Sequence, residues 1–106
     1  MYEDKKLYRL TKGLQLVPNA AADVTAKTAF VYQITVSNVT AGAVTFTVVD
    51  KATSAKTLIP TVSLPANSLT VIVFPKGVQM TGGINWVAGT INALHAEIEG
   101  YYAPGT

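Results

Sequence analysis

Apolar and polar residues alternate with a period of two along much of this chain, and this alternation most constrains its fold. Successive side chains of a β-strand point to opposite faces. In residues 28–38 one face is expected to carry Phe30, Tyr32, Ile34 and Val36, and the other Ala29, Gln33, Thr35 and Ser37. Residues 43–50 repeat the alternation. Because Thr40-Ala41-Gly42 has turn composition and lies between the two runs, we predict that they pair as a β-hairpin.

Further short strands are expected, separated by turns rich in Gly, Pro and Asn. They cover residues 14–17, 57–59, 69–74, 78–80 and 84–88. Pro60 is expected to stop the strand before it, and Pro75-Lys76-Gly77 to end the run before that turn. Residues 20–23 have the composition of one helical turn capped by Asn19, which is too short to assign.

The segment 94–102 fits either a helix face or a strand with one solvated face. Gly100 and the paired tyrosines that follow disfavour a helix. We therefore predict a final strand, on which one face carries Leu94, Ala96, Ile98, Gly100 and Tyr102 and the solvated face carries His95, Glu97, Glu99 and Tyr101.

About seven or eight short antiparallel strands with such turns are typical of a β-sandwich or jelly roll. A chain of 106 residues has the length of one domain and can bury a core without the support of disulfide bonds or metal ions. It has no Cys, so a disulfide framework and a thiolate metal site are both excluded. We predict a single all-β, sandwich or jelly-roll-like domain over residues 28–106. Residues 1–27 are predicted to form an N-terminal arm and a first short strand.

Charged residues are few and unevenly placed. They make up 13% of the chain, and none occurs in residues 28–49, 57–75 or 77–96. The solvated faces of these strands must therefore carry small neutral side chains, which lose little solvation and rotamer entropy when a partner covers them. Soluble monomeric proteins usually carry charged side chains on such faces. We interpret the neutral faces as contact surfaces in an assembly; an ordinary Thr-rich β protein is the competing interpretation.

A candidate partner interface is expected near the two ends of the chain. Residues 1–12 combine basic with apolar and aromatic side chains, and tyrosines offer a large contact area at low entropic cost. The candidate residues are Tyr2, Lys5, Lys6, Leu7, Tyr8, Arg9, Leu10, Tyr101 and Tyr102. The competing interpretation is an ordinary first strand, with the two final tyrosines filling the sandwich.

The sequence offers little catalytic chemistry. It contains one His and six carboxylates, and the pair His95 and Glu97 supplies two metal ligands where a site needs three or four. His95 as a base has no nucleophile that the sequence places beside it, and Gly82-Gly83 lacks the helix and Lys of a phosphate loop. We predict no enzymatic activity, metal or cofactor. A carbohydrate-binding sandwich that stacks a sugar on Trp86 is the alternative of another class, although the apolar neighbours of Trp86 favour burial.

Several turns in the second half of the chain form a recognisable series of short sequences. They are Leu64-Pro65-Ala66, Phe74-Pro75-Lys76-Gly77, Gly82-Gly83-Ile84 and Gly100-Tyr101. Over residues 30–102 the chain resembles the small β-sandwich virion proteins of tailed bacteriophages. The resemblance implies a structural virion protein without enzymatic activity, most simply a head decoration or cement protein, with an adaptor, tail or fibre component as the alternative. The N-terminal arm lies outside the resemblance.

The partners that the resemblance implies are the major capsid protein, other virion proteins and further copies of the chain, often as trimers. The expected location is the virion, after synthesis in the host cytoplasm. Residues 1–13 lack the apolar run of a signal peptide, and no apolar stretch approaches the roughly 18 residues of a membrane span. A net charge of +2 is too small to indicate nucleic acid. We therefore expect neither a membrane nor a nucleic-acid partner.

Overall fold

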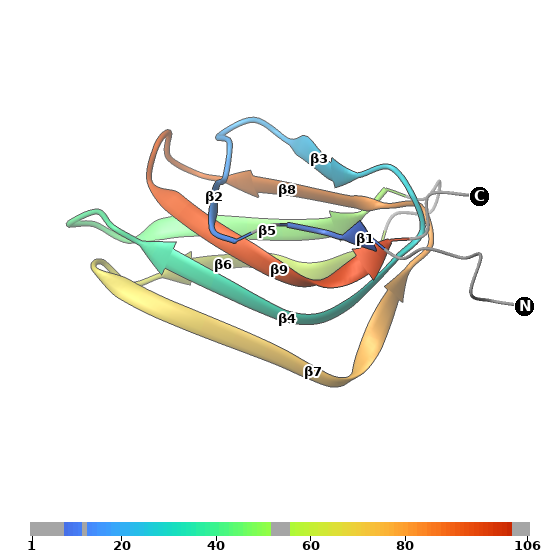
Figure 1. Ribbon diagram of the computed structural model, residues 1–106. Helices are drawn as coiled ribbons and strands as arrows, with labels where there is room; N and C mark the ends of the chain where they lie inside the picture. The colour runs from blue at the N-terminus through green and yellow to red at the C-terminus, as the bar shows by residue number, and fades with distance from the viewer. Residues whose placement is uncertain (1–7, 12, 52–55, 103–106) are drawn as a thin grey trace, which may run out of the picture.

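The computed structural model describes residues 8–11, 13–51 and 56–102. Within them, nine strands form two antiparallel sheets that pack face to face as a sandwich (Figure 1). Sheet A has the order β1-β9-β4-β7, with β2 also paired to β9, and sheet B has the order β3-β8-β5-β6. The strands are β1 (Tyr8–Arg9), β2 (Gln15–Leu16), β3 (Ala22–Thr25), β4 (Ala29–Asn38), β5 (Val44–Asp50), β6 (Thr57–Leu64), β7 (Ser68–Met80), β8 (Ile84–Ala88) and β9 (Leu94–Tyr102). The all-β sandwich predicted from the sequence is confirmed.

The core lies between the two sheets and is filled by alternate residues of the long strands. Sheet A contributes Val31, Ile34 and Val36 from β4 and Leu94, Ala96 and Ile98 from β9. Sheet B contributes Val44, Phe46 and Val48 from β5 and Ile84, Trp86 and Ala88 from β8. Each of the larger side chains stabilises the fold by about 1.5–3 kcal/mol through removal from water. The predicted alternation along residues 94–102 is confirmed, because Leu94, Ala96, Ile98 and Gly100 are buried.

The predicted alternation of β4 is wrong in its first half, because the strand contains a bulge at Tyr32. Val31 faces Gly100 of β9 and Gln33 faces Glu99, so Tyr32 has no counterpart in β9. One extra residue reverses the alternation on either side of a bulge. Phe30 and Tyr32 are consequently 41% and 42% exposed, whereas Val31 is buried.

The predicted hairpin between residues 28–38 and 43–50 is also wrong. β4 pairs with β7 and β9 in sheet A, whereas β5 pairs with β6 and β8 in sheet B. The segment 39–43 therefore crosses from one sheet to the other. Buried Asn38 fixes this crossing: its amide Nδ2 lies 3.0, 3.1 and 2.9 Å from the carbonyl oxygens of Gly42, Leu64 and Pro65. Its Oδ1 accepts hydrogen bonds from the backbone N–H and the hydroxyl of Thr40, at 3.0 and 2.8 Å.

Two prolines that were expected to end strands lie inside them. In β6, Pro60 and Thr61 together lie opposite Thr47, because Phe46 pairs with Val62 and Val48 with Ile59. A bulge in an outer strand tolerates a proline, since no ladder hydrogen bond is needed there. In β7, residues 74–77 lie opposite Tyr32 alone, and the strand bends there and continues to Met80. The two short strands predicted for residues 69–74 and 78–80 are therefore one bent strand (Figure 1).

The described part of residues 1–27 contributes strands to both sheets. β1 and β2 pair with β9, and β3 pairs with β8 in sheet B, where a helical turn had been one option for residues 20–23. Leu10, Thr11 and Val17 are buried. The Thr11 hydroxyl accepts a hydrogen bond from the backbone N–H of Ile98 at 3.2 Å. The described residues of this segment therefore help to close the sandwich. The described part of the chain has no helix with the length and apolarity to cross a membrane.

Candidate interaction surface

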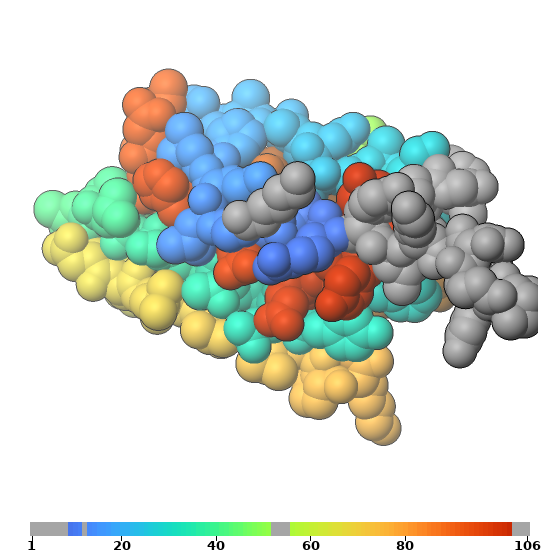
Figure 2. Space-filling model, viewed as in Figure 1, coloured from blue at the N-terminus to red at the C-terminus, as the bar shows by residue number. Residues whose placement is uncertain are grey.

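Exposed apolar side chains are concentrated on one of the two sheets. Among the described residues, the large apolar side chains that are exposed within strands all belong to sheet A: Leu16, Phe30, Tyr32, Leu69, Val71, Val73 and Tyr101. The outer face of sheet B is polar in comparison, with Thr45, Thr61 and Ser63 exposed. Figure 2 shows the side of the molecule formed by sheet A, with β7 in yellow to orange along its lower margin. The sandwich is thus strongly asymmetric in the character of its two outer faces.

The strand registers order the outer face of sheet A into rows. The β7 row consists of Leu69, Val71 and Val73, which are 64%, 49% and 56% exposed. These residues lie opposite Ser37, Thr35 and Gln33 of β4, and beyond them lie His95, Glu97 and Glu99 of β9. The face therefore changes from apolar at the β7 edge, through neutral polar side chains, to titratable side chains on β9.

Three exposed aromatic side chains lie beyond these rows, and we call Phe30, Tyr32 and Tyr101 the aromatic group. Phe30 lies directly opposite Tyr101 in the β4–β9 pairing. Side chains directly opposite each other in an antiparallel pair have Cβ atoms about 4.5–5.5 Å apart, so these two rings are neighbours. The ring of Tyr32 lies against Gly77 of β7, where a Cβ atom would come 2.6 Å from its Cε1 atom.

Two glycines make this arrangement possible. Gly77 has a φ of 74°, a left-handed conformation that favours glycine, and it leaves room for the Tyr32 ring. Gly100 lies opposite Val31 beside the bulge, and a Cβ atom there would overlap the carbonyl oxygen of Phe30. The glycines of the Phe-Pro-Lys-Gly and Gly-Tyr sequences therefore flank the β4 bulge from β7 and β9.

The residues predicted as an interface have different environments in the structure. Arg9 is exposed and forms an ion pair with Glu97 at 3.3 Å, Tyr101 is exposed, and Tyr102 is half-buried. Leu10 is part of the core, because it is only 8% exposed and packs in the cluster of buried residues. The backbone of Tyr8 pairs with Tyr102, and only the backbone of Tyr8 is described. Four of the predicted residues lie outside the described residues: Tyr2, Lys5, Lys6 and Leu7.

The sequence reasoning missed the β7 row and two members of the aromatic group. Phe30 and Tyr32 had been placed on the same face as Ile34 and Val36, because the bulge has no local sequence signal that alternation alone can detect. A signal for the β7 row was present. Residues 71–74 read Val-Ile-Val-Phe without a polar residue, which indicates a strand that is apolar on both faces rather than on one.

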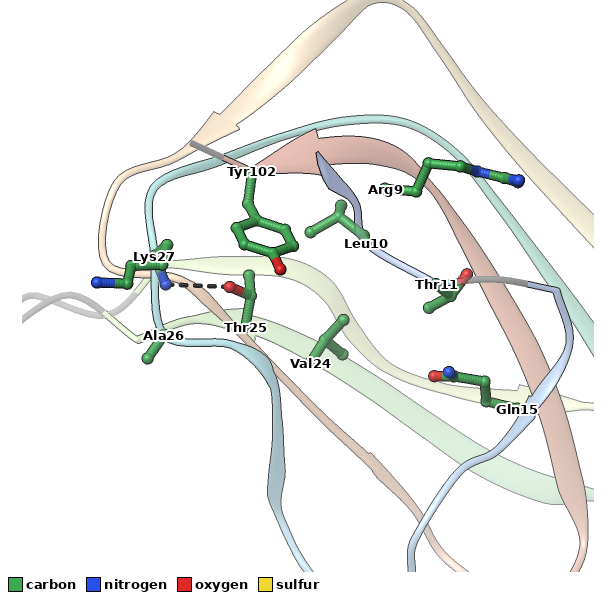
Figure 3. A pocket seen from close by; sticks show the side chains of 9 residues that line it. All are labelled: Arg9, Leu10, Thr11, Gln15, Val24, Thr25, Ala26, Lys27 and Tyr102. Carbon is green, nitrogen blue, oxygen red and sulfur yellow. Dashed lines mark hydrogen bonds between the residues drawn. The ribbon is translucent and has the colours of Figure 1, made fainter. Parts of the chain in front are cut away.

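A pocket of about 460 Å³ opens between β1 and β3. It is lined by Arg9, Leu10, Thr11, Gln15, Val24, Thr25, Ala26, Lys27 and Tyr102 (Figure 3). Figure 3 shows Leu10 and the Tyr102 ring facing Val24 and Thr25, with the Arg9 side chain directed away from them. The two threonine hydroxyls form hydrogen bonds within the chain. The Thr11 hydroxyl donates to the carbonyl oxygen of Ile98, and the Thr25 hydroxyl accepts from the backbone N–H of Lys27 at 3.1 Å. Two of the polar groups that line the pocket are therefore used by the chain itself.

The titratable groups do not form a metal-binding cluster in the described part of the chain. No three side chains of the metal-ligating types lie together within it. His95 lies opposite Ser37, and no hydrogen bond joins their side chains among the described residues. Asp23 is held by Lys51 at 2.7 Å and by Asn85 at 3.1 Å, and these hydrogen bonds lower the pKa of its carboxyl group.

Two further side chains singled out by the sequence or by their burial have structural roles. Buried Asp50 accepts hydrogen bonds from the backbone N–H groups of Thr81 and Gly82, at 3.0 and 2.9 Å, and so fixes the turn between β7 and β8. Trp86 is buried between the sheets. At 4% exposure, its ring has little surface on which a sugar could stack.

Comparison with known proteins leaves the chain without an assigned family. No protein-family model matches it, and no curated protein is significantly similar to it.

Proposed function

We propose that this protein is a non-enzymatic structural subunit that binds neighbouring protein subunits through the outer face of sheet A. The observation that carries the proposal is the concentration of exposed apolar strand residues on sheet A, compared with the polar outer face of sheet B. Exposed apolar side chains gathered on one face are typical of a protein–protein interface, and aromatic side chains are enriched there. The scarcity of charge in residues 28–96 favours the same use of this face.

The proposed assembly is the particle of a tailed bacteriophage, and the proposed role is that of a head decoration or cement protein on the lattice of the major capsid protein. This part of the proposal is supported by the resemblance in the turns at residues 64–66, 74–77, 82–84 and 100–101. An adaptor, tail or fibre component would use the same surface. Many weak contacts on a repeating lattice add up through multivalency, so each contact alone can be modest.

Substitution within the aromatic group tests this role. Tyr101→Lys places a charge within the aromatic group of the proposed contact, and we expect it to reduce co-sedimentation with phage heads that lack this protein at least tenfold. Thr61→Lys is the matched control, since it adds the same charge to an exposed position of sheet B. Thermal unfolding of both variants shows whether the sandwich is intact. Wild-type binding by Tyr101→Lys would refute the assigned surface, and failure of the unmodified protein to bind any phage head would refute the assigned assembly.

A test of the basic N-terminal segment, residues 1–12, requires a deletion that stops before β1. Leu10 and Thr11 are buried, and β1 pairs with β9, so removal of residues 1–12 would damage the sandwich as well as any contact. Deletion of residues 1–7 leaves β1 in place. If the segment contributes to binding, this truncated protein will bind heads more weakly with an unchanged melting temperature; equal binding would assign the contact to sheet A alone.

A further inference from the structure

The free edge of β7 lacks the protection that outer strands of monomeric proteins usually carry. In the described part of the chain β7 pairs only with β4, on one side. Such edges are commonly protected by charged residues, prolines or bends, which discourage pairing with another chain. The second half of β7 has all three in Pro75, Lys76 and the bend at Gly77. The first half, residues 68–74, has none of them and contains no charged residue.

This unprotected half also carries the most exposed apolar row of the molecule's strands. Leu69, Val71 and Val73 project from the outer face, and each is about half exposed or more. Ile72 and Phe74 project inward and are only partly buried, because no strand lies beside them on the free side. A strand added to this edge would cover side chains on both faces and would pair the outward backbone groups as well.

We propose that residues 68–74 of β7 pair antiparallel with the same residues of a second copy, which joins two copies of sheet A into one continuous sheet. The stretch is bounded by Asn67, which has a left-handed φ of 49°, and by Pro75, so its midpoint is Val71. A twofold axis at Val71 places the two Val71 side chains together and each Leu69 opposite Val73 of the second copy.

The absence of charge favours a second copy as the occupant. An isologous interface places identical surfaces against each other, so a charged edge would repel itself. Residues 68–74 contain no such charge, and their apolar row is nearly symmetric about Val71. A seven-residue edge buries less than the roughly 800 Å² per partner of a standard stable interface, so the dimer is expected to be weak, with a Kd in the micromolar range or above.

The inference rests on the assembly role proposed above, and it is tested on the purified protein alone, so that its failure is distinct from a failure of binding to phage heads. Sedimentation equilibrium of the full chain is expected to show a reversible monomer–dimer equilibrium. Val71→Lys should weaken it at least tenfold. Val39→Lys is the matched control, because Val39 is 58% exposed but lies outside β7. A wild-type protein that stays monomeric, or a Val71→Lys protein that dimerises normally, would overturn the proposal.

The register supplies a second readout that does not depend on a destabilising substitution. The chain has no Cys, so Leu69→Cys, Val71→Cys and Val73→Cys each allow one spin label per copy. Antiparallel pairing about Val71 predicts the shortest label-to-label distance at position 71 and longer distances at 69 and 73. Equal distances at the three positions would indicate parallel pairing and would contradict the proposed interface. If the protein stays monomeric and instead binds an extended peptide along β7, the occupant of this edge is a foreign strand. That result would also overturn the proposal.

Discussion

Replacement of Asn38 tests how the chain crosses between the sheets. Asn38 ends β4 and is only 2% exposed. Its amide contacts the carbonyl oxygens of Leu64 and Pro65, where β6 leads into β7, while its Oδ1 binds Thr40 in the crossing segment. One side chain therefore ties the crossing between β4 and β5 to the turn between β6 and β7.

The expected loss of stability follows from the number of polar groups that the substitution leaves without a hydrogen bond. Asn38→Ala removes the partner of the Thr40 N–H and of the Leu64 carbonyl oxygen, whereas the Pro65 carbonyl oxygen keeps a hydrogen bond from the Ser68 hydroxyl at 2.6 Å. Each buried polar group left unsatisfied costs about 1–3 kcal/mol. Water can reach the half-buried Thr40, so we expect a total loss of about 2–4 kcal/mol, a large part of the roughly 5–15 kcal/mol that stabilises a typical domain.

Asn38→Asp refines the test because it keeps the shape of the side chain. It retains an acceptor for Thr40 but places a carboxylate against the carbonyl oxygens of Gly42, Leu64 and Pro65, where a donor is needed. A buried carboxylate without a donor is strongly disfavoured. The variant should be at least as unstable as Asn38→Ala at neutral pH, and its deficit should shrink in acid, where the protonated carboxyl group can donate one bond.

Urea denaturation measures these differences, with the fluorescence of the single, buried Trp86 as the reporter. Asn19→Asp is the matched control, because it makes the same chemical change at an exposed position. The free energy of unfolding should differ between the two Asp variants by more than about 2 kcal/mol at pH 7 and by less at pH 4. A difference near zero at pH 7, or one that grows in acid, would refute the role assigned to the Asn38 amide.

Two further changes test other features of the fold. Gly100→Ala should destabilise the protein by about 1–3 kcal/mol, because the new methyl group overlaps the backbone of β4; Gly42→Ala, where a Cβ atom meets nothing within 4 Å, should have little effect in the same urea assay, and equal effects would argue against the close approach at the bulge. Asp23→Asn should cause a small loss of stability at neutral pH, since the hydrogen bond from Lys51 lowers the pKa of Asp23 below 3.8 in the folded protein. This contribution is present above pH 3.8 and is lost as the pH falls through the folded-state pKa, so the melting temperatures of the two proteins should converge in acid. A gap that persists at the lowest pH would contradict the assignment.

Local patterns in the sequence predicted most of the strands but not their partners. Residues 84–88 and 94–102 form strands as predicted, because alternation and β-propensity are properties of the segment itself. The predicted hairpin of β4 and β5 was wrong for the opposite reason, because strand pairing depends on residues elsewhere in the chain. The turn composition at residues 40–42 fits a hairpin and a crossing between sheets equally well, and the contacts of Asn38 that decide between them come from residues 64 and 65.

The candidate surface was predictable only in part, for the same physical reason. The neutral character of the strand faces and the exposure of Tyr101 followed from the sequence. The outward position of Phe30 and Tyr32 depends on the bulge, which requires Gly100 on one neighbouring strand and Gly77 on the other. The exposure of the β7 row depends on the position of β7 at the edge of sheet A. Neither property is encoded within the segment that displays it.

Amide hydrogen exchange at two protein concentrations tests most directly that copies of this protein associate along the β7 edge of sheet A. If copies of the protein associate along β7, the amides of residues 68–74 that point away from β4 will exchange quickly in dilute solution and more slowly in concentrated solution. Outward amides of β6, the outer strand of sheet B, serve as the internal reference and should exchange equally at both concentrations. Protection that is unchanged along β7, or that increases along β6 instead, would contradict the pairing of two copies along the β7 edge of sheet A.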